Sequence, residues 1–421
     1  MTFVVKKGEE LMQPKGIGYL QRKLECKRER VNLRYAFYEM KNHYRVNSQV
    51  IPNQLEYAYK SCLGWCEKAV DSLADRLVFK EFENDNFGMG EIFDMNNPDI
   101  LFDSAILGAL ISACDFIYIT KDENGFPRMQ IIDGGNATGI IDPITNMLTE
   151  GYAVLKRDEN DSPISEAYFL PYKTIVRTKG ERGITVVEEN HNAPYALLVP
   201  VINKPDARRP FGHSRITRAC MSLQEKAKQT ITRGDITAEF YSFPQKYVTG
   251  LSQDAEPLDA WRAAVSSMLQ FSKDDDGDKP TLGQFQQQTF APHIEQFKMY
   301  ASAFAGETGL TLDDLGFVAE NPSSSEAIKA SHETLRLQAR KAQRYFGTAF
   351  RNAGYLAACV RDNIAYERKA IYETRVIWEP VFEPDGAAIS VIGDGLSKIN
   401  SAIPGYVTEK TIERLTGIKS E

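Results

Sequence analysis

A repeat of apolar residues at every seventh position constrains the fold more than any other feature of this sequence. The repeat comprises Ile328, Leu335, Ala342, Ala349 and Leu356. A second apolar set falls between its members, at Ala339, Phe346, Ala353 and Val360. Such spacing places apolar side chains on one face of an α-helix, so it predicts one long helix over about 324–371. At 1.5 Å per residue the helix is about 70 Å long, whereas helices average about 11–12 residues. This length favours a spine in a larger assembly.

A start signal precedes the helix in the segment Asn321-Pro322-Ser323-Ser324-Ser325-Glu326-Ala327-Ile328. The Glu326 amide can donate to the Ser323 hydroxyl and the Ser323 amide to the Glu326 carboxylate, which are the two bonds of a capping box. Basic residues then recur along the helix at Lys329, Arg336, Arg340, Lys341, Arg344, Arg351, Arg361, Arg368 and Lys369. They predict a solvated or intersubunit face.

The charge balance limits how the chain contacts nucleic acid. Its 421 residues suffice for two or three domain-sized units, and 50 basic against 57 acidic residues give a formal charge of −7. A broadly basic surface is therefore not expected, and any DNA contact is expected to be local or weak. Six cysteines without a CxxC pair and the polar start MTFVVKKGEE favour a reducing cytoplasm and no signal peptide. The most apolar stretch, 106–119, is interrupted and shorter than the roughly 18 residues of a membrane span.

Periodicity and turn residues predict an α+β first half and a mainly helical second half. In the first half we expect helices over 19–41, 55–77 and 99–113, and strands over 116–120, 129–132, 168–170, 175–178 and 184–188. In the second half we expect helices over 214–240, 258–271, 292–307, 387–401 and 408–415, and strands over 281–290 and 374–382. The acidic run 273–280 is expected to form an exposed turn.

No catalytic template is complete in the sequence. The segment Gly212-His213-Ser214-Arg215-Ile216 lacks the final glycine of a nucleophile elbow, so we expect Ser214 to cap the helix that follows. Cys62 and Cys66 have no neighbouring histidine or further cysteine to complete a zinc site, and the acidic run lacks the glycine and glutamate of a calcium loop. No glycine cluster has phosphate-loop spacing. We expect a protein that is not an enzyme and that holds no cofactor or metal.

The chain resembles the portal proteins of long-tailed bacteriophages over most of its length, and four short segments, in this order, carry the resemblance. They are residues 70–79 (VDSLADRLVF), 211–216 (FGHSRI), 306–310 (GETGL) and 321–328 (NPSSSEAI). The resemblance implies a ring, usually of twelve subunits, with wing, stem, clip and crown regions around a channel. Carried onto this chain, it implies an α+β portal fold divided into a wing at 1–210, a first stem helix at 211–242, a clip at 243–290, a second stem helix at 291–309, a tunnel loop at 310–322, the long helix and a return strand at 323–385, and a short crown-like tail at 386–421.

The resemblance assigns a DNA-facing role to the tunnel loop. Its candidate residues are Thr311, Leu312, Asp313, Asp314, Leu315, Gly316, Phe317 and Val318. An acidic loop repels phosphate, whereas a basic one would release counterions and hold the strand, so the composition fits a conduit. An ordinary surface turn is the alternative. For the clip, Leu282 and Phe285 are candidates for docking a packaging motor, with packing inside the clip as the alternative.

The resemblance therefore implies a ring at one capsid vertex that passes double-stranded DNA without sequence specificity during packaging and ejection. Implied partners are further copies of the chain, the large terminase subunit, head-completion or adaptor proteins, and the major capsid and scaffolding proteins, with no membrane partner. The implied location is the virion, after assembly in the host cytoplasm. Another head-tail connector or adaptor ring is the alternative function, and a cytosolic hydrolase is a third.

Overall fold

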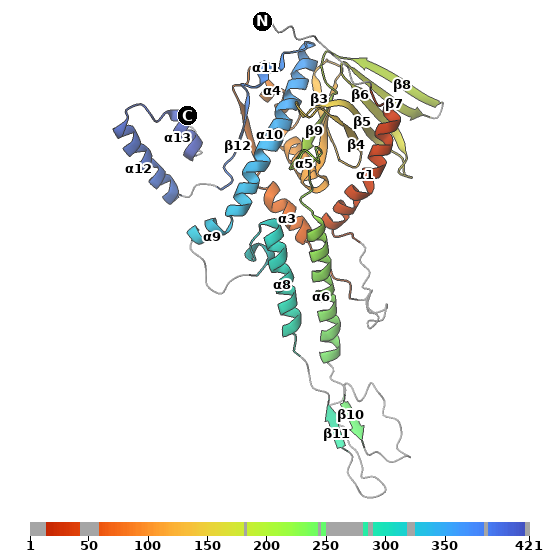
Figure 1. The fold of residues 1–421 in the computed structure, drawn as a ribbon, viewed down its shortest axis with the longest axis vertical. Helices are drawn as coiled ribbons and strands as arrows, with labels where there is room; N and C mark the ends of the chain where they lie inside the picture. Colours follow the sequence, from red (N-terminus) through yellow and green to blue (C-terminus); the bar gives the residue numbers. More distant parts are fainter. Residues whose placement is uncertain are drawn as a thin grey trace, which may run out of the picture. The chain divides into compact units, whose positions relative to one another are not determined.

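A computed structural model describes residues 14–42, 59–180, 183–242, 246–249, 281–284, 289–317, 325–382 and 386–416. The chain divides into two compact units (Figure 1). The first unit comprises Met1–Lys41, Cys66–Thr217 and Asn321–Glu421, and the second comprises Asn42–Trp65 and Arg218–Glu320. Helices and strands are mixed, which confirms the α+β class.

Three sheets build the first unit. A five-stranded antiparallel meander runs in the order β4 (Ala137–Ile141), β5 (Leu148–Arg157), β6 (Pro163–Leu170), β7 (Lys173–Gly180) and β8 (Gly183–Asn190). A three-stranded antiparallel sheet has the order β3 (Pro127–Ile132), β2 (Cys114–Lys121), β9 (Leu198–Ile202). A short ribbon pairs β1 (Phe79–Glu83) with β12 (Arg375–Trp378). Because β9 is buried along its whole length while β8 is exposed along its whole length, the three-stranded sheet belongs to the core and β8 forms an outer edge.

The long helix is shorter than predicted and interrupted near its start. After α9 (Ser325–Ser331) the chain leaves helical geometry at His332, and α10 (Glu333–Asp362) follows. From Leu335 onward the predicted apolar positions are buried, whereas Ile328 on α9 is 48% exposed. The prediction of helix as far as 371 is wrong, because Asn363 adopts a left-handed conformation with φ 55° and caps α10. A separate turn of helix, α11 (Arg368–Ile371), comes after this break.

Two further helices pack with α10 around an aromatic core. They are α5 (Pro98–Ser112) and α4 (Met89–Asp94). Phe102 of α5 lies 4.5 Å from Phe350 of α10, and Phe79 stacks on Phe102 at 4.0 Å between ring centroids. Such ring pairs contribute about 0.5–1.5 kcal/mol beyond the area they bury. Aromatic contacts thus join α10, α5 and the β1–β12 ribbon.

Two lysines fasten α1 (Ile17–Tyr38) to the five-stranded sheet. The ammonium group of Lys23 donates to the carbonyl oxygen of Gly139 at 2.6 Å, and that of Lys27 donates to the carbonyl oxygen of Ala137 at 2.9 Å. Both ammonium groups also lie over the ring of Phe211, at 4.6 and 5.9 Å from its centroid. Burial lowers the pKa of Lys23 to about 8. The lysine stems therefore pack as apolar groups while their charged ends use backbone oxygens of β4.

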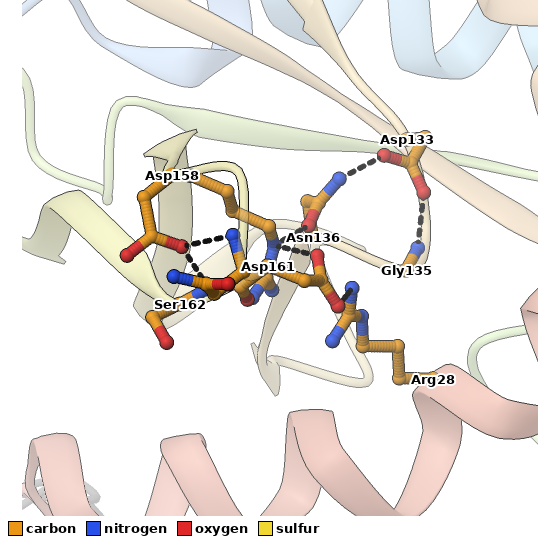
Figure 2. Close-up of polar contacts among 9 residues, drawn as sticks. Arg28, Asp133, Gly135, Asn136, Asp158, Asp161 and Ser162 are labelled. Carbon is orange, nitrogen blue, oxygen red and sulfur yellow. Dashed lines mark hydrogen bonds and ion pairs between the residues drawn. The ribbon is translucent and has the colours of Figure 1, made fainter.

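A surface network adds to this attachment of α1 (Figure 2). Arg28 is bonded to Asp161 in the turn between β5 and β6, and Arg157 donates to the side-chain oxygen of Asn136 at 2.9 Å. Asn136 in turn donates to Asp133, whose other oxygen accepts from the Gly135 amide at 2.6 Å. Two turns of the first unit are therefore held by local side-chain bonds.

A pair of helices with a small strand pair forms the second unit. Figure 1 shows α6 (Arg218–Ser242) beside α8 (Ala291–Thr308), and between them in sequence β10 (Lys246–Thr249) pairs antiparallel with β11 (Thr281–Gln284). Pro292 stands in the first turn of α8, where its missing amide hydrogen removes no helical bond. The Thr230 hydroxyl of α6 donates to the Gln296 side-chain oxygen of α8 at 3.2 Å. The two predicted helices at 214–240 and 292–307 are thus present with shifted ends.

Other predictions differ from the structure in their bounds. The expected helix over 55–77 is helical only in α3 (Trp65–Ala74) within the described residues, and the described residues of 59–64 are not helical. The last helices are α12 (Gly386–Ala402) and α13 (Glu409–Thr416), close to their predicted ranges. The expected helix over 258–271 and the exposed turn over 273–280 lie outside the described residues.

Candidate functional site

The predicted tunnel loop begins at a well-defined helix end in the second unit. Gly309 caps α8 in the left-handed region with φ 74°, and its amide donates to the carbonyl oxygen of Ala305 at 2.8 Å. A side chain would be strained at this φ, which explains a glycine at this point of the motif. Leu310 is buried directly afterwards, so the chain enters the loop from a fixed position.

The loop is closed by a reciprocal contact between two of its candidate residues. One carboxylate oxygen of Asp314 accepts from the amide and from the hydroxyl of Thr311, at 2.9 and 3.0 Å. The Asp314 amide donates back to the Thr311 hydroxyl oxygen at 3.1 Å. This is capping-box geometry around the single 3-10 turn η1 (Asp313–Leu315). The described part of the loop is therefore an ordered turn with its own bonds.

Backbone and aromatic contacts hold the far side of the turn. Gly316 is left-handed with φ 89°, which reverses the chain so that the Phe317 amide donates to the carbonyl oxygen of Leu312 at 3.0 Å. The Phe317 ring lies 5.7 Å from Phe297 of α8. Phe297 also contacts Trp65, at 5.2 Å between centroids. Both ends of the turn are thus fixed to α8 within the second unit.

The two loop aspartates have different surroundings. Asp313 is exposed, whereas Asp314 is half-buried and uses a carboxylate oxygen inside the turn. Leu312, Leu315 and Phe317 are half-buried. In the described loop the exposed carboxylate is therefore that of Asp313, and Asp314 mainly shapes the turn. Val318 lies outside the described residues.

The remaining candidate residues are described in part. Leu282 lies on β11 with its backbone paired to Val248 of β10, while its side chain and all of Phe285 lie outside the described residues. Glu326 is the second residue of α9, without a described side chain, and Ser323 lies outside the description. Their proposed roles stay predictions.

The FGHSRI segment has a structural role that sequence reasoning missed. Ser214 does not cap the next helix, because α6 begins at Arg218 and the Ser214 hydroxyl donates to the carbonyl oxygen of Ile111 at 2.6 Å. The Arg215 amide donates to the carbonyl oxygen of Leu110 at 2.8 Å. These carbonyls belong to the last turn of α5 and have no partner inside the helix. The predicted N-cap is therefore wrong, and the segment instead completes the end of α5.

Arg215 and Gly212 in the same segment are also fixed by their surroundings. The buried guanidinium donates to the carbonyl oxygen of Ala69 in α3 and, at 2.6 Å, to the side-chain oxygen of Gln338 in α10. A Cβ atom on Gly212, where φ is 73°, would meet the carbonyl oxygen of Asn203 at 2.1 Å. The segment thus joins four parts of the first unit.

Neither a membrane span nor a metal cluster occurs in the described ranges. No helix there is long and apolar enough to cross a membrane. The same residues contain no cluster of three or more histidine, cysteine, aspartate or glutamate side chains that could hold a metal ion.

The fold of this chain is similar to that of a solved particle protein. A chain from the neck of an empty gene transfer agent particle has the same fold, with a TM-score of 0.50, 11% identity, and coverage of 87% of this chain and 93% of that chain. No protein-family model matches. The fold is therefore one that also occurs in a particle neck.

Two proteins with similar sequences are both phage portal proteins. The portal protein of Mycobacterium phage L5 is 24% identical over 348 residues, which cover 76% of this chain and 69% of that protein. The portal protein of Mycobacterium phage D29 is 23% identical over 343 residues, which cover 76% of this chain and 70% of that protein. The chain is a homologue of these two phage portal proteins, and the predicted resemblance to portal proteins is confirmed.

Proposed function

We propose that this chain is the portal subunit of a tailed-phage particle. Copies of it form a ring, of twelve subunits, at one capsid vertex, and double-stranded DNA passes through the ring during packaging and ejection. The observation that carries the proposal is the homology with two portal proteins over about three quarters of the chain. Electron microscopy of the purified chain tests it, because rings of about a dozen subunits are expected and a monomeric particle at every concentration would contradict it.

In the ring, we assign α6 and α8 to the stem and residues 310–322 to the loop that faces DNA. The described turn supports this assignment, since it is short, held to α8 and exposes Asp313. A carboxylate repels passing phosphates and forms no binding well. The loop therefore guides DNA without retaining it.

Charge reversal at one position tests the loop assignment. Asp313→Lys places a cation where phosphates pass, so packaging should slow while rings still form. Glu159→Lys, on an exposed turn of the first unit, is the matched control and should package normally. A packaging rate for the Asp313→Lys ring equal to that of the control ring would refute the assignment. Shortening 312–319 is the stronger variant, and unchanged packaging by that ring would refute the assignment as well.

We assign the docking of the large terminase subunit, and afterwards of head-completion or adaptor proteins, to the clip, with Leu282 and Phe285 in the contact. Thr281, the neighbour of Leu282 on β11, supplies the matched control position. Leu282→Asp and Phe285→Asp should weaken terminase binding in a pull-down with rings, while Thr281→Asp should not. Equal terminase binding by all three rings would count against this contact.

The capsid and scaffolding proteins are the remaining partners in this proposal, which places the ring in the virion after assembly in the host cytoplasm. Incorporation at a single vertex distinguishes a portal from an adaptor ring that joins later. Labelled chain in particles stalled before DNA entry should occupy one vertex per particle. Its absence from such particles would favour the adaptor function.

A further inference from the structure

A basic groove runs along the outer side of α10 in the first unit. The groove has a volume of about 820 Å³ and lies between α10 and β12, which Figure 1 shows running side by side. Its cations are Arg340, Lys341, Arg344, Arg351 and Arg375. Apolar groups line it as well, among them Trp378 and Leu337, and Leu337 is 48% exposed. The groove therefore combines positive charge with uncovered apolar surface.

The groove cations form no ion pairs within the described part of the chain, where the nearby carboxylate that acts on Arg340 is Glu333, itself bonded to Arg336. None of the five forms an ion pair with a carboxylate of the described residues, and Arg340 and Arg344 repel one another across one helical turn. The buried Nε of Arg351 has no hydrogen-bond partner among those residues. Burial and the neighbouring charge of Arg368 lower the pKa of Arg351. A negatively charged partner would relieve this uncompensated charge.

An acidic face with the complementary chemistry lies elsewhere on the same unit. It comprises Asp75, directly after α3, and Asp99, Ile100 and Asp103 on the exposed side of α5. Ile100 is 71% exposed, and no described cation forms an ion pair with these aspartates. Burial and the charges of Asp99 and Asp75 raise the pKa of Asp103. The acidic face thus carries an excess of negative charge around an exposed apolar side chain.

The groove and the acidic face are different regions of one unit. The buried ring of Phe102, on the same helix as Ile100, packs against Phe350 of α10, so an aromatic core separates the acidic face from the groove. A contact between two different surfaces of identical chains is heterologous, and a heterologous contact that closes produces a ring. Complementary charge sets the register of such contacts and suppresses wrong pairings.

We propose that the basic groove of one copy receives the acidic face of the next copy, with Ile100 against Leu337 and Trp378 and the three aspartates among the groove cations. This contact deepens the proposed function and rests on it, since it assigns two surfaces to the subunit interface of the ring. The exposed apolar side chains favour a protein partner over DNA, whose phosphates would leave Leu337 and Ile100 in water.

Paired charge reversals test the contact. The groove variant is R340E/R344E and the face variant is D75K/D103K, both in the full-length chain. Each alone should raise the protein concentration needed for rings by about tenfold or more, measured by native mass spectrometry, because like charges then meet at every interface. K156E/K179E, which reverses two exposed lysines of the five-stranded sheet, is the matched control for the groove variant and should form rings as the unmodified chain does.

Mixing the groove variant with the face variant is the decisive test of the contact. Equal amounts of the groove variant and the face variant should form mixed rings with an even number of subunits in alternating order, since each groove then meets a face of opposite charge. The chain with all four substitutions should also form rings. Circular dichroism of each variant separates lost assembly from lost folding.

Three outcomes would overturn the contact. Single variants that form rings at the unmodified concentration would do so, as would folded variants whose mixture fails to assemble. Groove-variant rings that form normally but lose binding to a fluorescent double-stranded DNA would assign the groove to DNA instead. If the unmodified chain itself forms no ring, the proposed function fails. If the unmodified chain forms rings and the variants form them at the same concentration, only the assignment of the two surfaces fails.

Discussion

Two short motifs of this chain, FGHSRI in the first unit and the turn after GETGL in the second, are both built from polar contacts but at very different depth. Arg215 is buried and bonded to α3 and α10, over 146 and 123 positions of sequence. Asp314 bonds only three positions away to Thr311, in a turn that is partly exposed. The first motif therefore specifies how distant elements meet. The second shapes a surface turn and leaves the side chain of Asp313 exposed.

The largest predicted loss of stability is at Arg215. Arg215→Met retains much of the apolar stem but leaves the Ala69 carbonyl and the Gln338 side chain without this donor, so we expect a loss of about 3 kcal/mol in the free energy of unfolding. Chemical denaturation followed by circular dichroism measures it. Arg208→Met, at an exposed position nearby, should change the free energy by less than about 0.5 kcal/mol. Equal effects of the two substitutions would mean that the burial of Arg215 does not determine its contribution to stability.

Buried Asp115 provides the second test, by pH. Its carboxylate accepts from the Ser112 hydroxyl at 2.7 Å and the Gly134 amide at 2.9 Å, yet burial raises its pKa to about 7. Between about pH 4 and 7 the folded chain keeps a proton that the unfolded chain has lost, so this group makes stability fall as pH rises through that window. Asp115→Asn keeps an acceptor and removes the titration. The variant should gain on the order of 1–3 kcal/mol relative to the unmodified chain above pH 7 and little below pH 4. A difference that is constant from pH 4 to 8 would contradict this assignment.

The contrast between local and long-range contacts explains which features could be predicted from the sequence. The buried face of α10 follows from local periodicity, and Leu335, Ala342, Ala349 and Leu356 are all buried. The end of α10 at Asp362 has no proline or glycine to announce it, since Asn363 supplies the left-handed cap. The extension of this helix to 371 was accordingly wrong.

Tertiary contacts account for the other differences. Ser214 was expected to cap its own helix, but its partner Ile111 lies 103 positions away. The basic groove requires β12 beside α10, a contact that no spacing in the sequence encodes. The Thr311–Asp314 closure, in contrast, has the three-residue spacing of a capping box and was available to sequence reasoning.

A smaller effect is expected in the candidate loop. Asp314→Ala removes the two hydrogen bonds that the carboxylate accepts from Thr311, but the turn keeps the bond from the residue 314 amide, Gly309, Gly316 and the contact of Phe317 with Phe297, so we expect a loss of about 1 kcal/mol. Thermal unfolding measures the loss, and limited proteolysis should show faster cleavage within the loop. Asp313→Ala, at the exposed neighbour, should change neither. If Asp313→Ala accelerated loop cleavage as much as Asp314→Ala, the distinction between the shaping and the exposed aspartate would be lost.

The smallest effect is expected at Arg28. Because Arg28 and Arg215 lie in the same unit but differ in burial, comparing them shows which of the two properties determines the contribution to stability. Arg28 belongs to the same unit as Arg215, yet its side chain and that of Asp161 are 29% and 58% exposed, and solvent screens such a pair. Arg28→Ala should therefore lower the unfolding midpoint by no more than about 2 °C, and the difference should shrink further in about 1 M salt. A shift as large as that of Arg215→Met would show that attachment of α1 is itself decisive for the first unit. A small, salt-sensitive shift would leave burial of the polar group, and not the unit in which it lies, as the property that sets its contribution.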